Sequence, residues 1–343
     1  MFQLLQKAFA SFKKTHPSIG FVFTGKARSK YAVHVREGWL NAAQELGLHA
    51  RGYYAGKRKW DARRAVKYLN RQGHDVVFLI GGDWHLYDLH MPEGSAEAWS
   101  ELRVPTVCVC DERIAWPEFP DAEQRTRSAL ESFSFFAFTD EAAEPIFHAS
   151  GKPHLWIPQY IDAVTIRQTQ IPATRKPYVY FRGQINQWGI ASFYNARRHL
   201  YEALQGEPNV VLEEAYKPHL KPSELLKHKA SFAIYLHLPS NHPGYVTSFM
   251  EAGALGVDVM QHEIADDLPR TAKLFQPGQH FIPYQTTDVE GLKRIIQERV
   301  REIGSPEMKA MAESLQELVM REHTLTRRLA TILDHVGIKA AAK

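Results

Sequence analysis

Three short apolar runs in the first half of the chain restrict its fold more than any other feature. They are HDVVFLIGGD at 74–83, VPTVCVCDE at 104–112 and FSFFAFTD at 133–140, each followed or ended by glycine or polar residues. Nearly continuous apolar strands are typical of parallel sheets, because helices cover both faces of such a sheet. Amphipathic segments at 31–47 and 61–73 precede these runs and end in glycine, as helices do. We therefore predict a doubly wound α/β domain.

The same pattern restarts after a polar, proline-bounded segment at 162–177, which is the predicted linker. Further strands are predicted at YVYFRGQ (178–184), NVVLEEA (209–215), SFAIYLHL (231–238) and HFIPYQ (280–285), and amphipathic helices at 289–304 and from about 306 to 336. A chain of 343 residues is long enough for two domains. The predicted order is an N-terminal Rossmann-like domain at 1–161, the linker at 162–177, a second Rossmann-like domain at 178–322, and a C-terminal helix at 323–343 that could pack back onto the first domain.

Charge is distributed unevenly along the chain. The formal net charge is +4, but residues 1–75 contain 15 Lys and Arg against 4 Asp and Glu, a net charge of +11. The remainder of the chain therefore carries −7. Such a split indicates that the N-terminal region meets a polyanion, although a solvated basic surface without a partner is the alternative.

Two features bear on the compartment. No apolar run approaches the length of a membrane-spanning helix, and the start, MFQLLQKAFASFKK, lacks the features of a secretory signal. This first segment is weakly amphipathic, which predicts that it packs on the domain or, alternatively, lies on a membrane surface. Cys108 and Cys110 alternate along a predicted strand, so both face the same way as buried thiols, in poor geometry for a disulfide. We predict a reducing, cytoplasmic location.

The stretch GYVTSFMEAGALGVDVM, at 244–260, places a carboxylate in a compact helix that follows a buried strand. The chain has no GxGxxG fingerprint and no GxxxxGK[ST] loop, so neither a common dinucleotide site nor a P-loop is supported. A helix N-terminus can nevertheless hold a diphosphate through its backbone N–H groups and dipole. Glu251, about one turn inside, could accept hydrogen bonds from two ribose hydroxyls; alternatively it only interacts favourably with the helix dipole.

Four segments in order resemble a known family of enzymes. FMEAGALGVDVMQHE with the following LPRTAKLFQPGQHFIPYQ resembles the donor-binding signature of GT-B glycosyltransferases. The tail REHTLTRRLATIL, and the segments FAFTDEAAEPIFHASGKPHLWIPQYID and YVYFRGQINQWGIASFYNARRHLYEAL, resemble the spore-maturation (CgeB-like) glycosyltransferases. The resemblance spans roughly residues 130 to 335. It implies an α/β fold of two Rossmann-like domains facing across a cleft, with a nucleotide-sugar, favoured to be a UDP-sugar, as co-substrate.

The resemblance also implies roles for individual residues. It places Glu251 on the ribose and Arg182 near the phosphates, where an arginine fork suits the charge that develops on the leaving diphosphate. For Arg197 and Arg198, the alternative to a phosphate contact is a solvated position on a helix face. His323 and Arg327 belong to the tail that resembles the family, and for them the alternative is a structural role in which they hold the last helix in place. The complete predicted donor-binding set is Glu251, Arg182, Gly183, Tyr245, Val246, Thr247, Ser248, Arg197, Arg198 and, stacked on the base, Tyr216.

One position departs from the family pattern. Many retaining GT-B enzymes have a second glutamate eight positions before the ribose-binding one, where this chain has Pro243. The anomeric outcome is therefore left open.

A catalytic base is expected from the N-terminal domain, and the candidates at predicted strand ends are Asp111, Asp83 and His34. The histidines form no HExxH or other metal-ligand spacing, so we predict no essential metal.

Basic residues cluster at 24–36 and 56–71, with aromatic residues close to the second cluster. This pattern suits a phosphate backbone with an exposed base, so the leading acceptor is a hydroxylated base in DNA. A phosphate-bearing surface polymer or lipid, or a protein or small glycan, is the alternative acceptor. A nucleic-acid-binding module that has lost catalysis is the alternative function. The predicted acceptor-binding residues are Lys26, Arg28, Lys30, Lys57, Arg58, Lys59 and Trp60.

Overall fold

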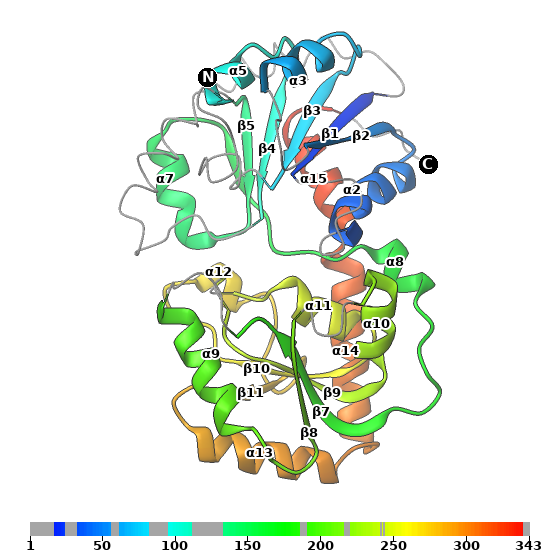
Figure 1. Ribbon diagram of the computed structural model, residues 1–343, viewed down its shortest axis with the longest axis vertical. Helices are drawn as coiled ribbons and strands as arrows, with labels where there is room; N and C mark the ends of the chain where they lie inside the picture. Colours follow the sequence, from blue (N-terminus) through cyan, green and yellow to red (C-terminus); the bar gives the residue numbers. More distant parts are fainter. Residues whose placement is uncertain are drawn as a thin grey trace. The chain divides into compact units, whose positions relative to one another are not determined.

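A computed structural model describes residues 17–24, 33–55, 62–81, 95–111, 133–185, 191–215, 220–240, 242 and 244–338. The chain divides into two compact units, coloured along the sequence in Figure 1. The first unit contains Met1–Asp162 and Leu325–Lys343, and the second contains Ala163–Thr324. Each unit is built on one parallel sheet, which confirms the predicted class of two Rossmann-like α/β domains. Among the described residues, no helix combines the length and apolar character needed to span a bilayer.

The first unit has a sheet of six parallel strands in the order β2-β1-β3-β4-β5-β6. The strands are β1 (Ser18–Thr24), β2 (His49–Ala55), β3 (Val76–Ile80), β4 (Thr106–Cys110), β5 (Phe135–Phe138) and β6 (His154–Trp156). The helices are α2 (Val33–Glu45), α3 (Ala62–Leu69), α5 (Ser95–Ser100), the 3-10 helix η1 (Glu141–Ala143), α7 (Glu144–Ala149) and α15 (Leu325–His335).

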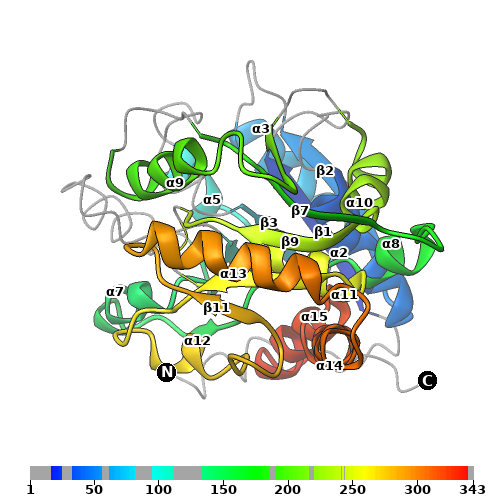
Figure 2. The same cartoon turned by 90° about the horizontal axis from the view of Figure 1, so that it is seen from below.

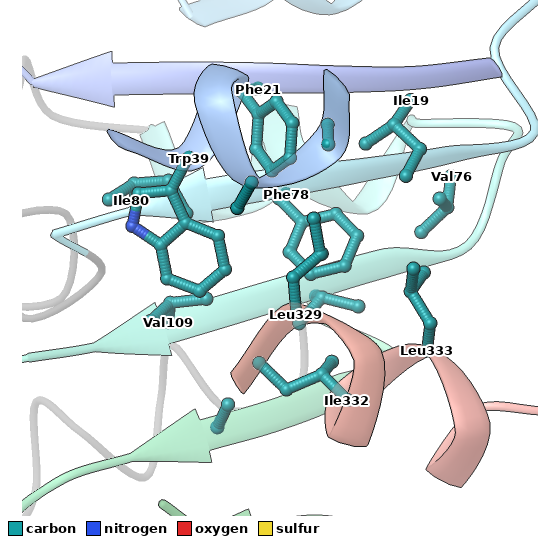
Figure 3. Close-up of a cluster of buried hydrophobic side chains, with 14 of the residues drawn as sticks. Ile19, Phe21, Trp39, Val76, Phe78, Ile80, Val109, Leu329, Ile332 and Leu333 are labelled. Carbon is teal, nitrogen blue, oxygen red and sulfur yellow. The ribbon is translucent and has the colours of Figure 1, made fainter. Parts of the chain in front are cut away.

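Both faces of this sheet are covered, as the apolar strands predict. Phe21 and Phe78 point to one face, where they pack with Trp39 of α2 and Leu329 of α15 (Figure 3). The alternate strand residues, such as Leu79, point to the other face against α3, α5 and α7. Because side chains alternate across a strand, a strand that is covered on both faces must be apolar throughout, and every residue of β3, β4 and β5 is buried.

The second unit has five parallel strands in the order β11-β10-β9-β7-β8. The strands are β7 (Lys176–Gly183), β8 (Val210–Glu214), β9 (Phe232–His237), β10 (Asp258–His262) and β11 (Ile282–Tyr284). The helices are α8 (Ala163–Gln168), α9 (Ala191–Ala203), α10 (Pro222–Ala230), α11 (Thr247–Ala254), α12 (Pro269–Ala272), α13 (Val289–Arg301) and α14 (Pro306–Glu322). Residues of α9 and α13 share one apolar cluster with β7 and β9, and Figure 2 shows α13 lying across this sheet.

Three segments differ from the sequence-based expectation. Helix α8 occupies part of the segment predicted as a linker at 162–177. HLW at 154–156, where the sequence pattern predicted no strand, forms β6 and pairs with β5. The amphipathic segment from about 306 to 336 forms two helices, because α14 ends at Glu322 and α15 begins at Leu325. Both helices are amphipathic, but their apolar faces belong to different units, and a periodic pattern does not reveal where the chain changes units.

In each sheet, the second strand along the chain lies on one side of the first strand and the later strands lie on the other side. The strand order therefore reverses between β1 and β3 in the first sheet and between β7 and β9 in the second. Ligands of open α/β sheets bind outside the carboxyl ends of the strands at such a reversal. The segments that follow β1 and β3, at 25–32 and 82–94, lie outside the described residues. The reversal between β7 and β9 is therefore the point around which a candidate site can be built.

Candidate functional site

Helix α11 begins at the carboxyl edge of the second sheet, directly after the loop that follows β9. Its N-cap residue is Val246, in extended conformation with φ −97° and ψ 166°. A valine side chain cannot accept a hydrogen bond, so the N-cap residue does not satisfy the first-turn N–H groups with its own side chain. Thr247 and Ser248 in this turn are half-buried. A helix N-terminus of this kind can bind an anion, and diphosphate binding at α11 stays a prediction.

Gly244 and Tyr245, shortly before α11, are closely packed. A Cβ on Gly244 would lie 2.7 Å from Cγ2 of Thr271, so a larger residue does not fit without movement. The backbone N–H of Gly244 donates to Nδ1 of His242 at 3.2 Å. The ring of Tyr245 is buried and packs edge-on against Phe275. Tyr245 therefore anchors the start of the helix through its side chain, and only its backbone remains as a candidate ligand group.

Glu251 lies one turn inside α11 and forms a buried ion pair with Lys229 from the end of α10. Lys229 Nζ is 2.7 Å from Oε2 of Glu251, and the two side chains are 4% and 7% exposed. The same Nζ donates to the carbonyl of Ser248 at 3.2 Å and lies 4.8 Å from the ring centre of Tyr235. The pair ties the carboxylate to the first turn of α11. Sequence analysis did not single out Lys229, because nothing local links it to a residue 22 positions away.

Arg197 connects the segments that follow β7 and β9, the two neighbouring strands between which the strand order reverses. Its guanidinium donates to the carbonyl of Gln184, after β7, at 3.0 Å and to the carbonyl of Leu238, after β9, at 3.2 Å, and Nε donates to the carbonyl of Pro239. Arg197 is buried, whereas its neighbour Arg198 is exposed. The alternative of a solvated helix face is thus wrong for Arg197, which braces the two loops beside α11. A contact with phosphate stays a prediction for both arginines.

Arg182, at the end of β7, belongs to a polar cluster centred on Glu213. The two residues are cross-strand neighbours in β7 and β8, and Arg182 NH1 lies 2.7 Å from Oε2 of Glu213. Glu213 also accepts hydrogen bonds from Tyr180 OH at 3.0 Å and His228 Nε2 at 2.9 Å. Burial acts to raise the pKa of Glu213, but the hydrogen bonds from His228, Arg182 and Tyr180 outweigh it and leave the pKa lowered. The carboxylate therefore orients Arg182 at the carboxyl edge of the sheet.

This cluster predicts an acid-sensitive contribution to stability. Because the pKa of Glu213 is lowered in the folded chain, its contribution is fully present above the unfolded pKa of about 4.3 and is lost as the pH falls through the folded pKa. Glu213→Gln should cost about 1–3 kcal/mol of unfolding free energy at pH 7, and the difference from the wild type should shrink as the pH falls below about 4. Urea unfolding at a series of pH values measures this difference.

The matched control for this measurement is Glu298→Gln on the exposed side of α13. This variant should change the unfolding free energy by less than about 0.5 kcal/mol at neutral pH. A difference between wild type and Glu213→Gln that stays constant from neutral to acid pH would show that the carboxylate contributes nothing through its charge.

Two buried histidines lie at the ends of β9 and β10. The rings of His237 and His262 are stacked with centres 5.6 Å apart, and burial is the main cause that lowers the pKa of each. Both imidazoles are therefore neutral at physiological pH. Within the described ranges, no group of three or more His, Cys, Asp or Glu side chains is arranged to hold a metal ion. Metal-independent chemistry stays a prediction.

A separate hollow of about 350 Å³ opens beyond β10 and β11. Its walls come from the loops that follow these two strands, and none of the predicted donor-binding residues lines it. The lining residues are Glu263, Ile264, Ala265, Asp266, Gln285, Thr286 and Thr287.

The candidate catalytic residues of the first unit differ in how far the structure describes them. Asp111 follows β4 and is half-buried, and its carbonyl accepts a hydrogen bond from Gln159 Nε2 at 2.7 Å. The hydroxyl of Tyr160 lies 3.5 Å from Asp111 Oδ2. His34 lies in the first turn of α2, where only its backbone is described, and Asp83 lies outside the described residues. Gln159 and Tyr160, which contact Asp111, lie in the segment at 136–162 that resembles the family, but sequence analysis did not single them out.

The predicted acceptor-binding residues and two donor-site positions cannot be placed. All of them fall in segments outside the described residues: Lys26, Arg28, Lys30, Lys57, Arg58, Lys59, Trp60, Tyr216 and Pro243.

Comparison with known proteins gives one family match and several structural likenesses. Residues 173–334 match a family model described as glycosyl transferase-like. No curated protein matches the sequence significantly. A glycosyltransferase from Rickettsia africae is similar with a TM-score of 0.61 at 10% identity, over 94% of this chain and 99% of that chain.

Two further solved structures are similar over nearly their whole length. Anabaena Alr3699/HepE, in complex with UDP and glucose, gives a TM-score of 0.62 at 13% identity, over 93% of this chain and 100% of that chain. An alpha-glucosyltransferase in complex with UDP and a 13-mer DNA containing an HMU base gives 0.62 at 11% identity, over 94% and 99%. At such identities the likeness shows the fold alone.

Proposed function

This chain has the GT-B fold of glycosyltransferases, and we propose that it transfers a sugar from a UDP-sugar to a hydroxyl of an anionic acceptor. The observation that carries the proposal is the start of α11 at the reversal between β7 and β9. There an N-terminus with valine as its N-cap residue, the closely packed Gly244 and a buried carboxylate lie within residues 244–251. The similar structures of Anabaena HepE and the alpha-glucosyltransferase both hold UDP, which supports a uridine donor.

The first turn of α11 would hold the diphosphate. As the glycosidic bond breaks, the leaving nucleoside diphosphate gains negative charge, which the helix dipole and the N–H groups of Thr247 and Ser248 would stabilise. Arg182, oriented by Glu213 at the neighbouring strand end, would add a fixed positive charge. Glu251 would accept hydrogen bonds from the ribose hydroxyls, with Lys229 holding its carboxylate in place.

The proton of the acceptor hydroxyl needs a base as the new bond forms. Asp111 is our first candidate, because Gln159 and Tyr160 hold it at the carboxyl end of β4. Asp83 and His34 are the others. We further propose that the transfer needs no essential metal and that the protein is located in the cytoplasm. We also propose that the chain is related to the spore-maturation glycosyltransferases.

For the acceptor we propose DNA that carries hydroxylated bases. The net charge of +11 within residues 1–75 supports a polyanion, and a structurally similar alpha-glucosyltransferase is complexed with DNA containing an HMU base. Surface polymers, lipids and proteins are the alternative acceptors. A catalytically inactive nucleic-acid-binding module is the alternative function.

Thr247→Pro tests the diphosphate site directly. Thr247 is the first residue of α11, a position where proline is compatible with the helix, and Val246 before it is already extended. The substitution removes one backbone N–H, so UDP affinity measured by calorimetry should fall about 10- to 100-fold, as expected when a hydrogen bond to a charged group is removed. Slow hydrolysis of UDP-sugar should fall with it.

The matched control is Thr247→Ala, which keeps the backbone N–H and removes the side-chain hydroxyl and the γ-methyl group. It should bind UDP nearly as the wild type does. Equal reductions in both variants would show that the backbone N–H is not a ligand. Wild-type protein that binds no UDP or GDP and hydrolyses no sugar nucleotide would instead support the catalytically inactive module.

A further inference from the structure

The hollow beyond β10 and β11 has the size and the position of a ligand site. Its volume is about 350 Å³, and it opens where these two paired strands end. Small-molecule pockets have volumes of roughly 300–1,000 Å³, so this one suits a small ligand of about the size of one sugar ring. Ligands of open α/β sheets bind outside the carboxyl ends of the strands, which is where this hollow lies.

Hydrogen bonds hold the walls of the hollow in place. The backbone N–H of Glu263 donates to the carbonyl of Tyr284 at 3.2 Å, which joins the two loops that follow the paired strands. The carbonyl of Glu263 accepts a hydrogen bond from Nδ1 of His262 at 2.9 Å. On the opposite wall, the N–H of Asp288 donates to the carbonyl of Gln285 at 3.3 Å. A ligand would therefore enter a preformed site and lose little affinity to the ordering of loops.

The residues that line the hollow favour hydroxyl groups over phosphate. Glu263 and Asp266 carry carboxylates, which accept hydrogen bonds and repel anions. Ile264 lies between them in the chain and adds an apolar group. The other wall supplies one amide and two hydroxyls, which both donate and accept, from Gln285, Thr286 and Thr287. A sugar ring matches this lining, because it has hydroxyl groups on its rim and C–H groups on its faces.

His262, which comes directly before Glu263, adds a buried hydrogen-bond acceptor. Its Nδ1 donates to the Glu263 carbonyl, and burial lowers the pKa of the ring, so His262 is neutral near pH 7 and its Nε2 carries a lone pair. The residue is 9% exposed, and among the described residues this Nε2 has no hydrogen-bond partner. Buried polar atoms rarely stay unpaired, so a hydroxyl group of water or of a ligand is expected beside it.

The hollow lies close to the start of α11. In the sheet, β10 is the neighbour of β9, and β11 is the next strand. Since neighbouring strands are about 4.8 Å apart, the hollow lies about 5–10 Å to the side of the end of β9. The loop that forms its first wall leads into α12, where Thr271 packs against Gly244 before α11, and Figure 1 shows α12 near α11 in the second unit. The hollow and the predicted diphosphate site are therefore neighbours in one unit.

We propose that this hollow binds a sugar ring through its hydroxyl groups, with the carboxylates of Glu263 and Asp266 as acceptors. The inference rests on the proposed function, for which it names the residues that recognise carbohydrate. Two molecules can supply such a ring: the donor, whose sugar is joined to the diphosphate, or an acceptor that itself carries a sugar. The hydroxyl chemistry is the same for both, and the experiment distinguishes them.

The test compares nucleotide and nucleotide-sugar binding by the full chain and by Glu263→Gln/Asp266→Asn. Both substitutions keep the side-chain size and replace a carboxylate by an amide at an exposed position, and thermal unfolding checks that the variant is folded. Calorimetry measures the affinity for UDP, UDP-glucose, UDP-galactose and UDP-N-acetylglucosamine. If the ring belongs to the donor, affinity for the UDP-sugar that the wild type binds most tightly should fall about 10-fold or more, as expected when hydrogen bonds to charged groups are lost. Affinity for UDP should stay within about twofold of the wild type.

If the ring belongs to the acceptor, the variant should keep the wild-type affinity for every UDP-sugar. The methyl glycosides of glucose, galactose and N-acetylglucosamine, titrated with and without UDP and followed by saturation-transfer NMR, should then bind to the wild type and not to the variant. A variant that matches the wild type with every nucleotide-sugar and every glycoside would overturn the proposal.

The matched control is Asp267→Asn/Glu298→Gln. It removes the same number of carboxylates from exposed positions, one in the same loop and one on α13, and neither residue lines the hollow. It should bind every probe as the wild type does. Equal losses in both variants would also overturn the proposal, since a change in net charge would then explain the effect without any contact in the hollow.

UDP binding separates this inference from the proposed function. A wild type that binds no UDP and no UDP-sugar, but binds a glycoside that the hollow variant does not bind, would refute the glycosyltransferase and keep the carbohydrate site. A wild type that binds UDP and whose sugar binding is unaffected by the two substitutions would refute only the carbohydrate site.

Discussion

Ending the chain after Thr324 should unfold the first unit while the second unit stays folded. The truncation removes α15, whose residues belong to the first unit although they come last in the sequence. Burial of an apolar side chain contributes about 1.5–3 kcal/mol, so removing six of them costs roughly 10 kcal/mol or more, comparable with the whole stability of a domain. The buried side chains that the truncation removes are Leu325, Leu329, Ile332, Leu333, Val336 and Ile338.

Amide hydrogen exchange followed by mass spectrometry measures the two units separately. Protection should disappear from β1, β3 and β4 and persist in β7 and β9 of the truncated chain. UDP binding should survive, because the candidate donor site lies in the second unit. Truncation after Ile338 is the control and should change nothing, since all six buried side chains remain. Full protection of β3 in the chain that ends at Thr324 would contradict this account.

Lys229→Met should lower the unfolding free energy of the second unit by about 3–5 kcal/mol. Lys229 and Glu251 are 4% and 7% exposed, so replacing the lysine removes the positive charge that lies 2.7 Å from a buried carboxylate. Glu251→Ala should cost a similar amount for the reciprocal reason. A loss of UDP affinity in Glu251→Ala alone therefore would not distinguish a ribose contact from a disturbed α11. Urea unfolding followed by circular dichroism measures both single variants.

The double variant Lys229→Met/Glu251→Met separates the two roles. Apolar replacement of both members of a buried ion pair is often neutral or stabilising, so the double variant should recover most of the stability that either single variant loses. If Glu251 binds ribose, UDP affinity should stay low in the recovered protein. Recovery of both stability and UDP affinity would show that Glu251 is purely structural.

Much of the fold could be predicted from local pattern. The uniformly apolar β3, β4 and β5 follow from burial on both faces, and α13 forms within the segment at 289–304 that was predicted as an amphipathic helix. Strand β6 was missed because three half-buried residues show no period, and its identity as a strand depends on pairing with β5. Helix α12, with four residues, is likewise too short for a periodic signal.

The candidate site was predictable only in part. The position of Glu251 behind a glycine loop was visible, because a strand, a turn and a helix are consecutive in the chain. Its partner Lys229, and the bracing of two loops by Arg197, depend on residues that meet only after the sheet forms. Arg182 was expected to meet phosphate, and in the structure it pairs with Glu213 on the neighbouring strand.

Local sequence alone specified most strands, most helices and the order of two α/β domains, because burial on both faces and helical period act over a few neighbouring residues. Tertiary structure alone decided that α15 completes the first unit, that a lysine 22 positions away neutralises Glu251, and that Arg197 is buried. These outcomes depend on contacts between distant segments, and the same amphipathic or basic pattern is compatible with several partners until packing selects one.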